Sequence, residues 1–107
     1  MKKSKVVWTA TAVRDLEDII DYISLDSINS AIEQYEKIKE DTIYLTEFPK
    51  SGRIIPELYE QNITKYRETI ISPWRIMYKE EQNVVYIMAI SDGRRNIEDI
   101  LMRRNIR

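Results

Sequence analysis

Residues 66–91, YRETIISPWRIMYKEEQNVVYIMAIS, decide the fold of this chain. They contain three segments rich in β-branched and aromatic residues, namely Tyr66–Ile71, Trp74–Lys79 and Val84–Ser91. Ser72-Pro73 separates the first two, and Glu80–Asn83 separates the second from the third. Connections this short are those of β-hairpins. The stretch therefore predicts a meander of three antiparallel strands.

The middle segment of the meander alternates as a strand with two different faces does. One face is expected to carry Trp74, Ile76 and Tyr78. The opposite face is expected to carry Arg75, Met77 and Lys79. The run Val84–Ile90 is apolar on both faces, which predicts a central strand that is covered on both sides.

Upstream of the meander, apolar residues recur with the spacing of amphipathic helices. A first helix is predicted over residues 10–24, with Thr9 or Thr11 as its N-cap. A second helix is predicted from Ile28 to Phe48, where Pro49 ends it. Two helices joined by a few residues pair antiparallel, so a helical hairpin is expected.

Shorter elements complete the predicted fold. Lys5–Thr9 is typical of a short strand, Lys50–Arg53 of a turn, and residues 95–104 of a short C-terminal helix. A helical hairpin on one face of an antiparallel sheet gives a two-layer α+β fold. The 107 residues match the usual size of a single domain, so one domain over residues 1–107 is expected.

The composition excludes several classes of chemistry. The chain has no Cys and no His, so a disulfide scaffold, a Ser-His-Asp triad and a Cys- or His-ligated metal are ruled out. No metal site and no cofactor are expected. No apolar run approaches the ~20 residues that span a bilayer, and no signal peptide is evident. We expect a cytoplasmic protein that does not associate with a membrane.

Charge is distributed unevenly along the chain. Residues 14–48 carry ten acidic and three basic side chains, whereas residues 50–107 carry eleven basic and eight acidic ones. Arginine forks bind phosphates and carboxylates and stay charged at any working pH. We therefore predict a concave basic face on the side of the sheet away from the helices, lined by Arg67, Arg75, Arg94 and Arg95 and rimmed by Tyr66 and Tyr78. The alternative is that these arginines form ordinary surface salt bridges.

The order of elements and several motifs resemble the RelE/ParE family of toxins from type II toxin–antitoxin systems. The similarity covers nearly the whole chain, and five stretches carry it: Ala12–Leu16, Pro49–Arg53, Tyr66–Glu68, Pro73–Lys79, and Val84–Ile90 followed by Asp92–Arg95. The resemblance implies the α+β fold predicted above. It also implies a toxin that inhibits growth.

The resemblance implies two different activities. RelE-like members cleave mRNA on the ribosome, and their catalytic arginines would correspond to Arg75 and Arg95, with Arg67 at one of their lysines. The tyrosine that serves the cleavage corresponds to Leu101, and a second lysine corresponds to Thr69. ParE-like members poison DNA gyrase. Leu101 and the long acidic helical hairpin make the chain more similar to the ParE-like members.

The resemblance also implies a cognate antitoxin, a small and partly disordered partner with an acidic tail. The tail would bury apolar surface along the helical hairpin or the sheet edge. The groove between the first helix and the sheet is a candidate site, with the basic concave face receiving the acidic residues of the tail. Operator DNA would be reached only through the antitoxin. A third possibility is an inactive member that acts only as an antitoxin-binding co-repressor.

Overall fold

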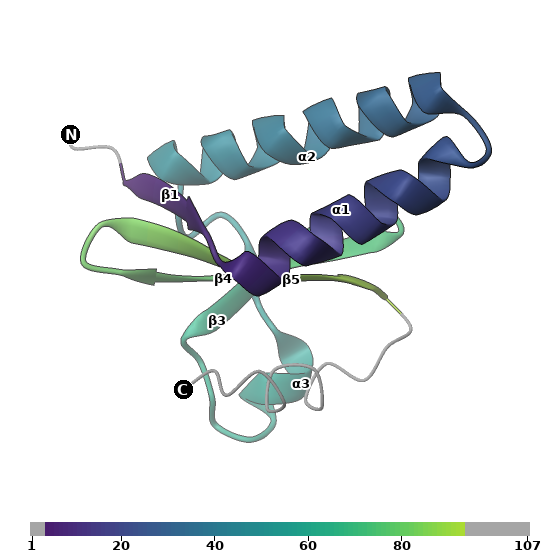
Figure 1. The fold of residues 1–107 in the computed structure, drawn as a ribbon. Helices are drawn as coiled ribbons and strands as arrows, with labels where there is room; N and C mark the ends of the chain where they lie inside the picture. The colour runs from purple at the N-terminus through teal and green to yellow at the C-terminus, as the bar shows by residue number, and fades with distance from the viewer. Residues whose placement is uncertain (1–3, 94–107) are drawn as a thin grey trace.

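The computed structural model describes residues 4–93, which form a five-stranded sheet and three helices. The elements are, in chain order, β1 (Lys5–Trp8), α1 (Ala10–Ser24), α2 (Ile28–Glu47), β2 (Arg53–Ile54), α3 (Pro56–Tyr59), β3 (Tyr66–Ile71), β4 (Trp74–Glu81) and β5 (Val84–Asp92). The α+β fold class is confirmed (Figure 1). The predicted helix over residues 95–104 lies outside the described residues.

The helical hairpin begins and turns at capped positions. The Thr9 hydroxyl accepts a hydrogen bond from the Ala12 backbone N–H at 3.2 Å, and the Ser27 hydroxyl accepts one from Ser30 N–H at 3.1 Å. Each cap satisfies an amide that the first helical turn leaves without a partner. The predicted spans of both helices and the Thr9 cap are confirmed within a residue.

The sheet has the strand order β1-β5-β4-β3-β2. Strands β3, β4 and β5 form the predicted antiparallel meander, in which Ile71 pairs with Trp74 across the first turn. The strand β1 lies parallel to β5, with Lys5 opposite Val84. β5 is therefore an interior strand, as its apolar run predicts, although β4 occupies the middle of the sheet.

The two faces of the sheet are covered by different elements (Figure 1). On one face, Ile76, Tyr78 and Ile87 pack with Leu16 of α1 and Ile38 of α2. On the other face is a second, smaller core: Ile55, Leu58, Tyr66, Met77 and Ala89. The alternation predicted for β4 is confirmed, because Ile76 and Tyr78 lie in the core under the hairpin and Met77 lies in the core on the opposite face.

The face away from the hairpin is covered where the sequence analysis expected it to be open. Segment 53–59 forms β2 and α3, where the sequence analysis predicted no strand or helix, and it brings Ile55 and Leu58 over the sheet. Elements of two and four residues are too short to produce a periodic pattern. In the part of the chain that the structure describes, no helix is long and apolar enough to cross a membrane.

Candidate functional site

Arg75 lies in β4 on the face that α3 covers, and its side chain is held by two carboxylates. Nη1 and Nη2 each donate to Glu57 of α3 at 2.8 Å, and Nε donates to Glu68 of β3 at 2.6 Å. The two bonds to Glu57 make a bidentate pair, the strongest geometry that a guanidinium forms with a carboxylate. Only 7% of Arg75 is exposed.

Glu68 lies at the centre of this cluster because a second arginine contacts it. Arg53 Nε donates to Glu68 Oε2 at 2.7 Å, while Arg75 occupies Oε1. Glu68 is 1% exposed, so both of its oxygens need these donors. We call Arg53, Glu57, Glu68 and Arg75 the arginine–glutamate cluster. It contains two positive and two negative side chains, and it ties α3 and β2 to the sheet.

The cluster shifts the titration of its members. The hydrogen bond from Arg75 is the largest influence on Glu57 and lowers the pKa of that carboxyl below its ordinary value, although burial acts in the opposite direction. The bonds to Glu57 and Glu68 raise the pKa of Arg75, so its guanidinium stays charged. Arg75 is thus a permanent cation whose charge two neighbouring carboxylates balance.

Arg67 lies on the opposite face of the sheet from Arg75. It pairs with Tyr78 across β3 and β4, and its Nη1 donates to Gly52 C=O at 2.7 Å. This contact holds the chain just before β2. The expectation that Arg67 and Arg75 line one face is therefore wrong, and Glu68 takes the place beside Arg75.

Tyr66 and Tyr78 are core residues, with exposures of 3% and 0%, and they do not form the expected rim. The Tyr78 hydroxyl donates to Pro49 C=O at 2.8 Å and accepts from Gly52 N–H at 2.9 Å. The Tyr66 hydroxyl is buried without a hydrogen-bond partner. Burial raises the pKa of both tyrosines, so both are neutral at physiological pH. Arg94 and Arg95 lie outside the described residues.

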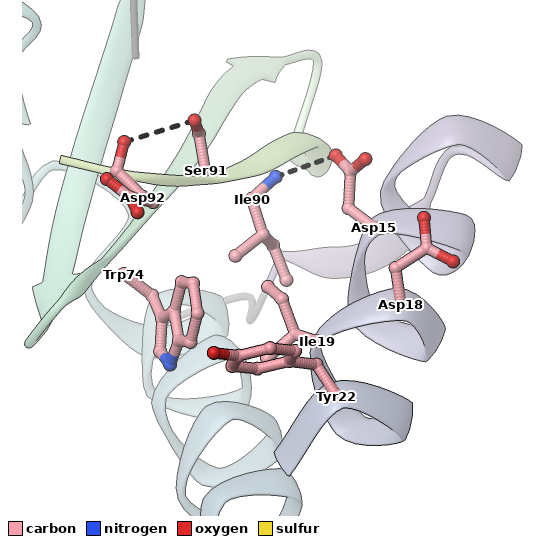
Figure 2. Close-up of a pocket in the computed structure, with 8 residues that line it drawn as sticks. All are labelled: Asp15, Asp18, Ile19, Tyr22, Trp74, Ile90, Ser91 and Asp92. Carbon is pink, nitrogen blue, oxygen red and sulfur yellow. Dashed lines mark hydrogen bonds between the residues drawn. The ribbon is translucent and has the colours of Figure 1, made fainter. Parts of the chain in front are cut away.

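The groove between α1 and the sheet, expected to take the antitoxin tail, is acidic. Its cavity measures about 340 Å³ and is lined by Asp15, Asp18, Ile19, Tyr22, Trp74, Ile90, Ser91 and Asp92. Figure 2 shows the rings of Trp74 and Tyr22 beside Ile19, with Asp15 and Asp18 on the helix at one side and Asp92 on the strand at the other. Asp15 accepts a hydrogen bond from Ile90 N–H at 3.0 Å, which joins α1 to β5.

The acidic residues of the tail were expected on the basic concave face, where the structure does not bring Arg67 and Arg75 together. The three aspartates come from two distant segments, so their convergence could be found only from the fold. Within residues 4–93, no group of three acidic side chains is arranged to hold a metal ion.

A larger groove, of about 720 Å³, runs between α1 and α2. Apolar and aromatic side chains form much of its lining: Trp8, Val13, Leu16, Ile20 and Tyr35. Lys39 lies over the Trp8 ring at 5.2 Å from the centroid. The charged residues on its α1 side are acidic apart from one arginine, namely Glu17, Asp18, Asp21 and Arg14. This mixture of apolar surface and charge is typical of a site for a protein partner.

The fold is that of solved toxin–antitoxin structures. One is described as the chromosomal ParDE toxin–antitoxin system from P. aeruginosa, with a TM-score of 0.68, 20% identity, and coverage of 84% of this chain and 96% of that one. Another is the toxin–antitoxin complex RelBE2 from Mycobacterium tuberculosis, with a TM-score of 0.59, 18% identity, and coverage of 84% and 98%. The search of curated proteins gave no match.

The family follows from the sequence itself. A family model described as the ParE toxin of the type II toxin–antitoxin system parDE matches residues 6–97. The match covers most of the chain, and the chain therefore belongs to the ParE toxin family.

Proposed function

We propose that this protein inhibits growth by acting on DNA gyrase and does not cleave RNA. Membership of the ParE toxin family supports the choice of target. The state of Arg75 carries the argument against cleavage. A phosphate clamp needs guanidinium N–H groups that face the substrate, but Arg75 already gives two of them to Glu57 and one to Glu68.

The proton transfers that RNA cleavage needs are a second argument against cleavage. Attack by a 2′-hydroxyl needs a group that accepts its proton and another that donates one to the leaving oxygen. Leu101 occupies the position that the resemblance assigns to the proton-handling tyrosine, and a leucine side chain can do neither. The chain has no histidine to replace it.

We further propose a cognate antitoxin that covers the groove between α1 and α2. Val13 and Tyr35 are 40% and 43% exposed there, and an amphipathic partner helix would bury them. Basic residues beside its apolar stripe would face Glu17 and Asp21.

The test uses one preparation of the protein in two assays. In a gyrase supercoiling reaction, we expect supercoiling to fall as protein is added and to recover when antitoxin is added first. In a translation reaction followed by primer extension, we expect no new cuts in the mRNA. Unchanged supercoiling at high excess would overturn the proposal, and cuts within translated codons would replace gyrase with the ribosome.

A growth experiment separates these activities from the co-repressor alternative. Induction of the gene without its antitoxin is expected to stop growth, and induction of both together is expected to restore it. Normal growth on induction of the folded toxin alone would show that the protein is an inactive family member.

A further inference from the structure

The outer edge of β3 is only partly covered by β2. β2 pairs with Arg67 and Glu68, and Ile55 N–H donates to Tyr66 C=O at 3.1 Å. In an antiparallel pair, outward-pointing backbone groups recur every second residue, so Tyr66, Glu68 and Ile70 face this edge. Within residues 4–93, no strand pairs with Ile70 on that side. The edge therefore offers one backbone donor and one acceptor to another chain.

A groove of about 460 Å³ runs beside this edge, between β3 and α2. Its lining residues are Lys37, Glu40, Asp41, Tyr44, Ile70, Ile71 and Ser72. Ile70 is 49% exposed and Tyr44 is 53% exposed. The edge therefore has two chemically different faces. The face toward α3 carries the apolar side chain of Ile70, and the face toward α2 borders the partly polar groove.

Asp41 supplies the specific chemistry of the groove. Its Oδ2 atom is buried and has no hydrogen-bond partner. Lys37 precedes it by one helical turn, but among the ion pairs of the described chain none joins these two residues. The side chain of Asp41 lines the groove, so its negative charge lies beside the edge of β3 and would attract a cationic side chain placed there. The neighbouring Glu40 adds a second negative charge.

We propose that an extended segment of a partner protein adds to the edge of β3 at Ile70 and places an arginine or lysine in the groove at Asp41. Successive side chains of a strand point to opposite faces. The residues on either side of the cation would therefore lie over Ile70, and they should be apolar. The motif that fits this edge is a basic residue between two β-branched residues.

The antitoxin proposed above is the partner expected to supply this segment. The inference rests on that proposal for the source of the segment, but its chemistry follows from the edge and from Asp41. Backbone pairing gives such complexes their affinity, and the pockets for alternate side chains give them their specificity.

The experiment titrates the ¹⁵N-labelled full chain with two blocked peptides while its amide resonances are followed. One peptide alternates valine with threonine and has a single arginine at its centre, and the other has glutamine there. The arginine peptide is expected to shift the amides of Ile70 and of residues around Asp41, with saturation near millimolar concentrations. The glutamine peptide should bind about tenfold more weakly.

Two variants of α2 that lose the same charge provide the control. Asp41→Asn is expected to weaken the arginine peptide about tenfold, and Glu36→Gln, at an exposed position outside the groove, should change its affinity less than twofold. Equal binding of both peptides, or shifts that avoid Ile70, would overturn the inference. Shifts at Ile70 that depend on protein concentration without peptide would assign the edge to a second copy of this chain.

These outcomes are separate from those of the gyrase assay. The titration needs neither gyrase nor antitoxin, so a protein that leaves supercoiling unchanged can still bind the arginine peptide. Conversely, a protein that inhibits gyrase but does not bind the peptide at Ile70 would overturn only the inference about the edge.

Discussion

Tyr66 and Tyr78 lie in neighbouring strands and are both buried, but their hydroxyl groups have different surroundings. The Tyr78 hydroxyl joins Pro49 and Gly52 to the sheet through two hydrogen bonds. The Tyr66 hydroxyl has no hydrogen-bond partner. A buried polar group stabilises a fold only when it is paired, so the same chemical change should affect the two sites differently.

Tyr66→Phe is expected to leave the free energy of unfolding unchanged or to raise it by up to about 1 kcal/mol, because it removes an unpaired hydroxyl. Tyr78→Phe is expected to lower it by about 1–3 kcal/mol, because Gly52 N–H would lose its acceptor and Pro49 C=O its donor. Urea unfolding of both variants measures the difference. A larger loss for Tyr66→Phe would show that water or another group pairs with its hydroxyl.

Arg75→Ala should be among the most destabilising single substitutions in β4. It would leave Glu68 buried with only Arg53, and a broken buried ion pair typically costs about 3–5 kcal/mol. Arg53→Ala is the matched comparison and should cost less, because it removes one hydrogen bond to Glu68, whereas Arg75→Ala removes one to Glu68 and two to Glu57. If Arg75→Ala unfolded at the same urea concentration as the wild type, the cluster would have no structural role.

The arginine–glutamate cluster should also make stability depend on pH. The pKa of Glu57 in the folded protein lies below its ordinary value of 4.5, so its ionised form stabilises the fold. This contribution is complete above pH 4.5 and is lost as the pH falls through the lowered pKa. Glu57→Gln should therefore unfold more easily than the wild type at neutral pH, and the difference should narrow in acid. Thermal unfolding from pH 7 to pH 3 tests this, and a constant difference would contradict it.

At the scale of the elements, the antiparallel pairing of β2 with β3 depends on a close approach of the chain to the sheet at Gly52. A Cβ atom there would lie 2.5 Å from the Tyr78 hydroxyl oxygen and 2.6 Å from the Glu68 carbonyl oxygen. Real Cβ atoms do not come so close, and the carbonyl belongs to the backbone of a paired strand. The chain before β2 can therefore lie against the sheet only with a glycine at this position.

Gly52→Ala is expected to lower the free energy of unfolding by about 1–3 kcal/mol, as overpacking of a dense interior does. Gly93→Ala is the control because its nearest contact would be an ordinary 3.8 Å, and its effect should stay within about 0.5 kcal/mol. Differential scanning calorimetry of both variants would separate them by several degrees. Equal melting temperatures would mean that the backbone yields at Gly52.

The helices and the meander could be predicted because each repeats its pattern over many residues. β2 and α3 were missed, although Pro56 and Glu57 have the composition of a first helical turn. That Arg67 and Arg75 lie on opposite faces of the sheet could have been predicted from the sequence. A two-residue turn after Ile71 places Arg67 opposite Tyr78, and Tyr78 was already assigned to the face away from Arg75. The contact of Glu57 with Arg75 needs the path of α3, which no local pattern specifies.

At the scale of the whole molecule, the sheet joins segments from both ends of the described chain. β1 makes its strand pairing with β5, and Asp15 of α1 bonds to Ile90 of β5. The helical hairpin packs on a core that includes Val85, Ile87 and Ile90. Without β5, the apolar side chains that α1 and α2 direct toward the sheet would therefore lose most of the residues that bury them.

A fragment that ends at Glu81 should not fold, because it keeps both helices and β4 but lacks β5. Its circular dichroism should show much less helix than the full chain, and it should unfold without a cooperative transition. A fragment with native helix content and a sharp transition would show that the hairpin is an independent unit.

The parallel pairing of β1 with β5 also has a consequence for synthesis. The residues of β1 must wait for those of β5, which the ribosome makes much later, and contacts so distant in sequence slow folding. Until β5 is made, the nascent chain exposes apolar surface to proteases and chaperones. A growing cell would thus have an interval in which the unfinished polypeptide can be destroyed before it becomes harmful.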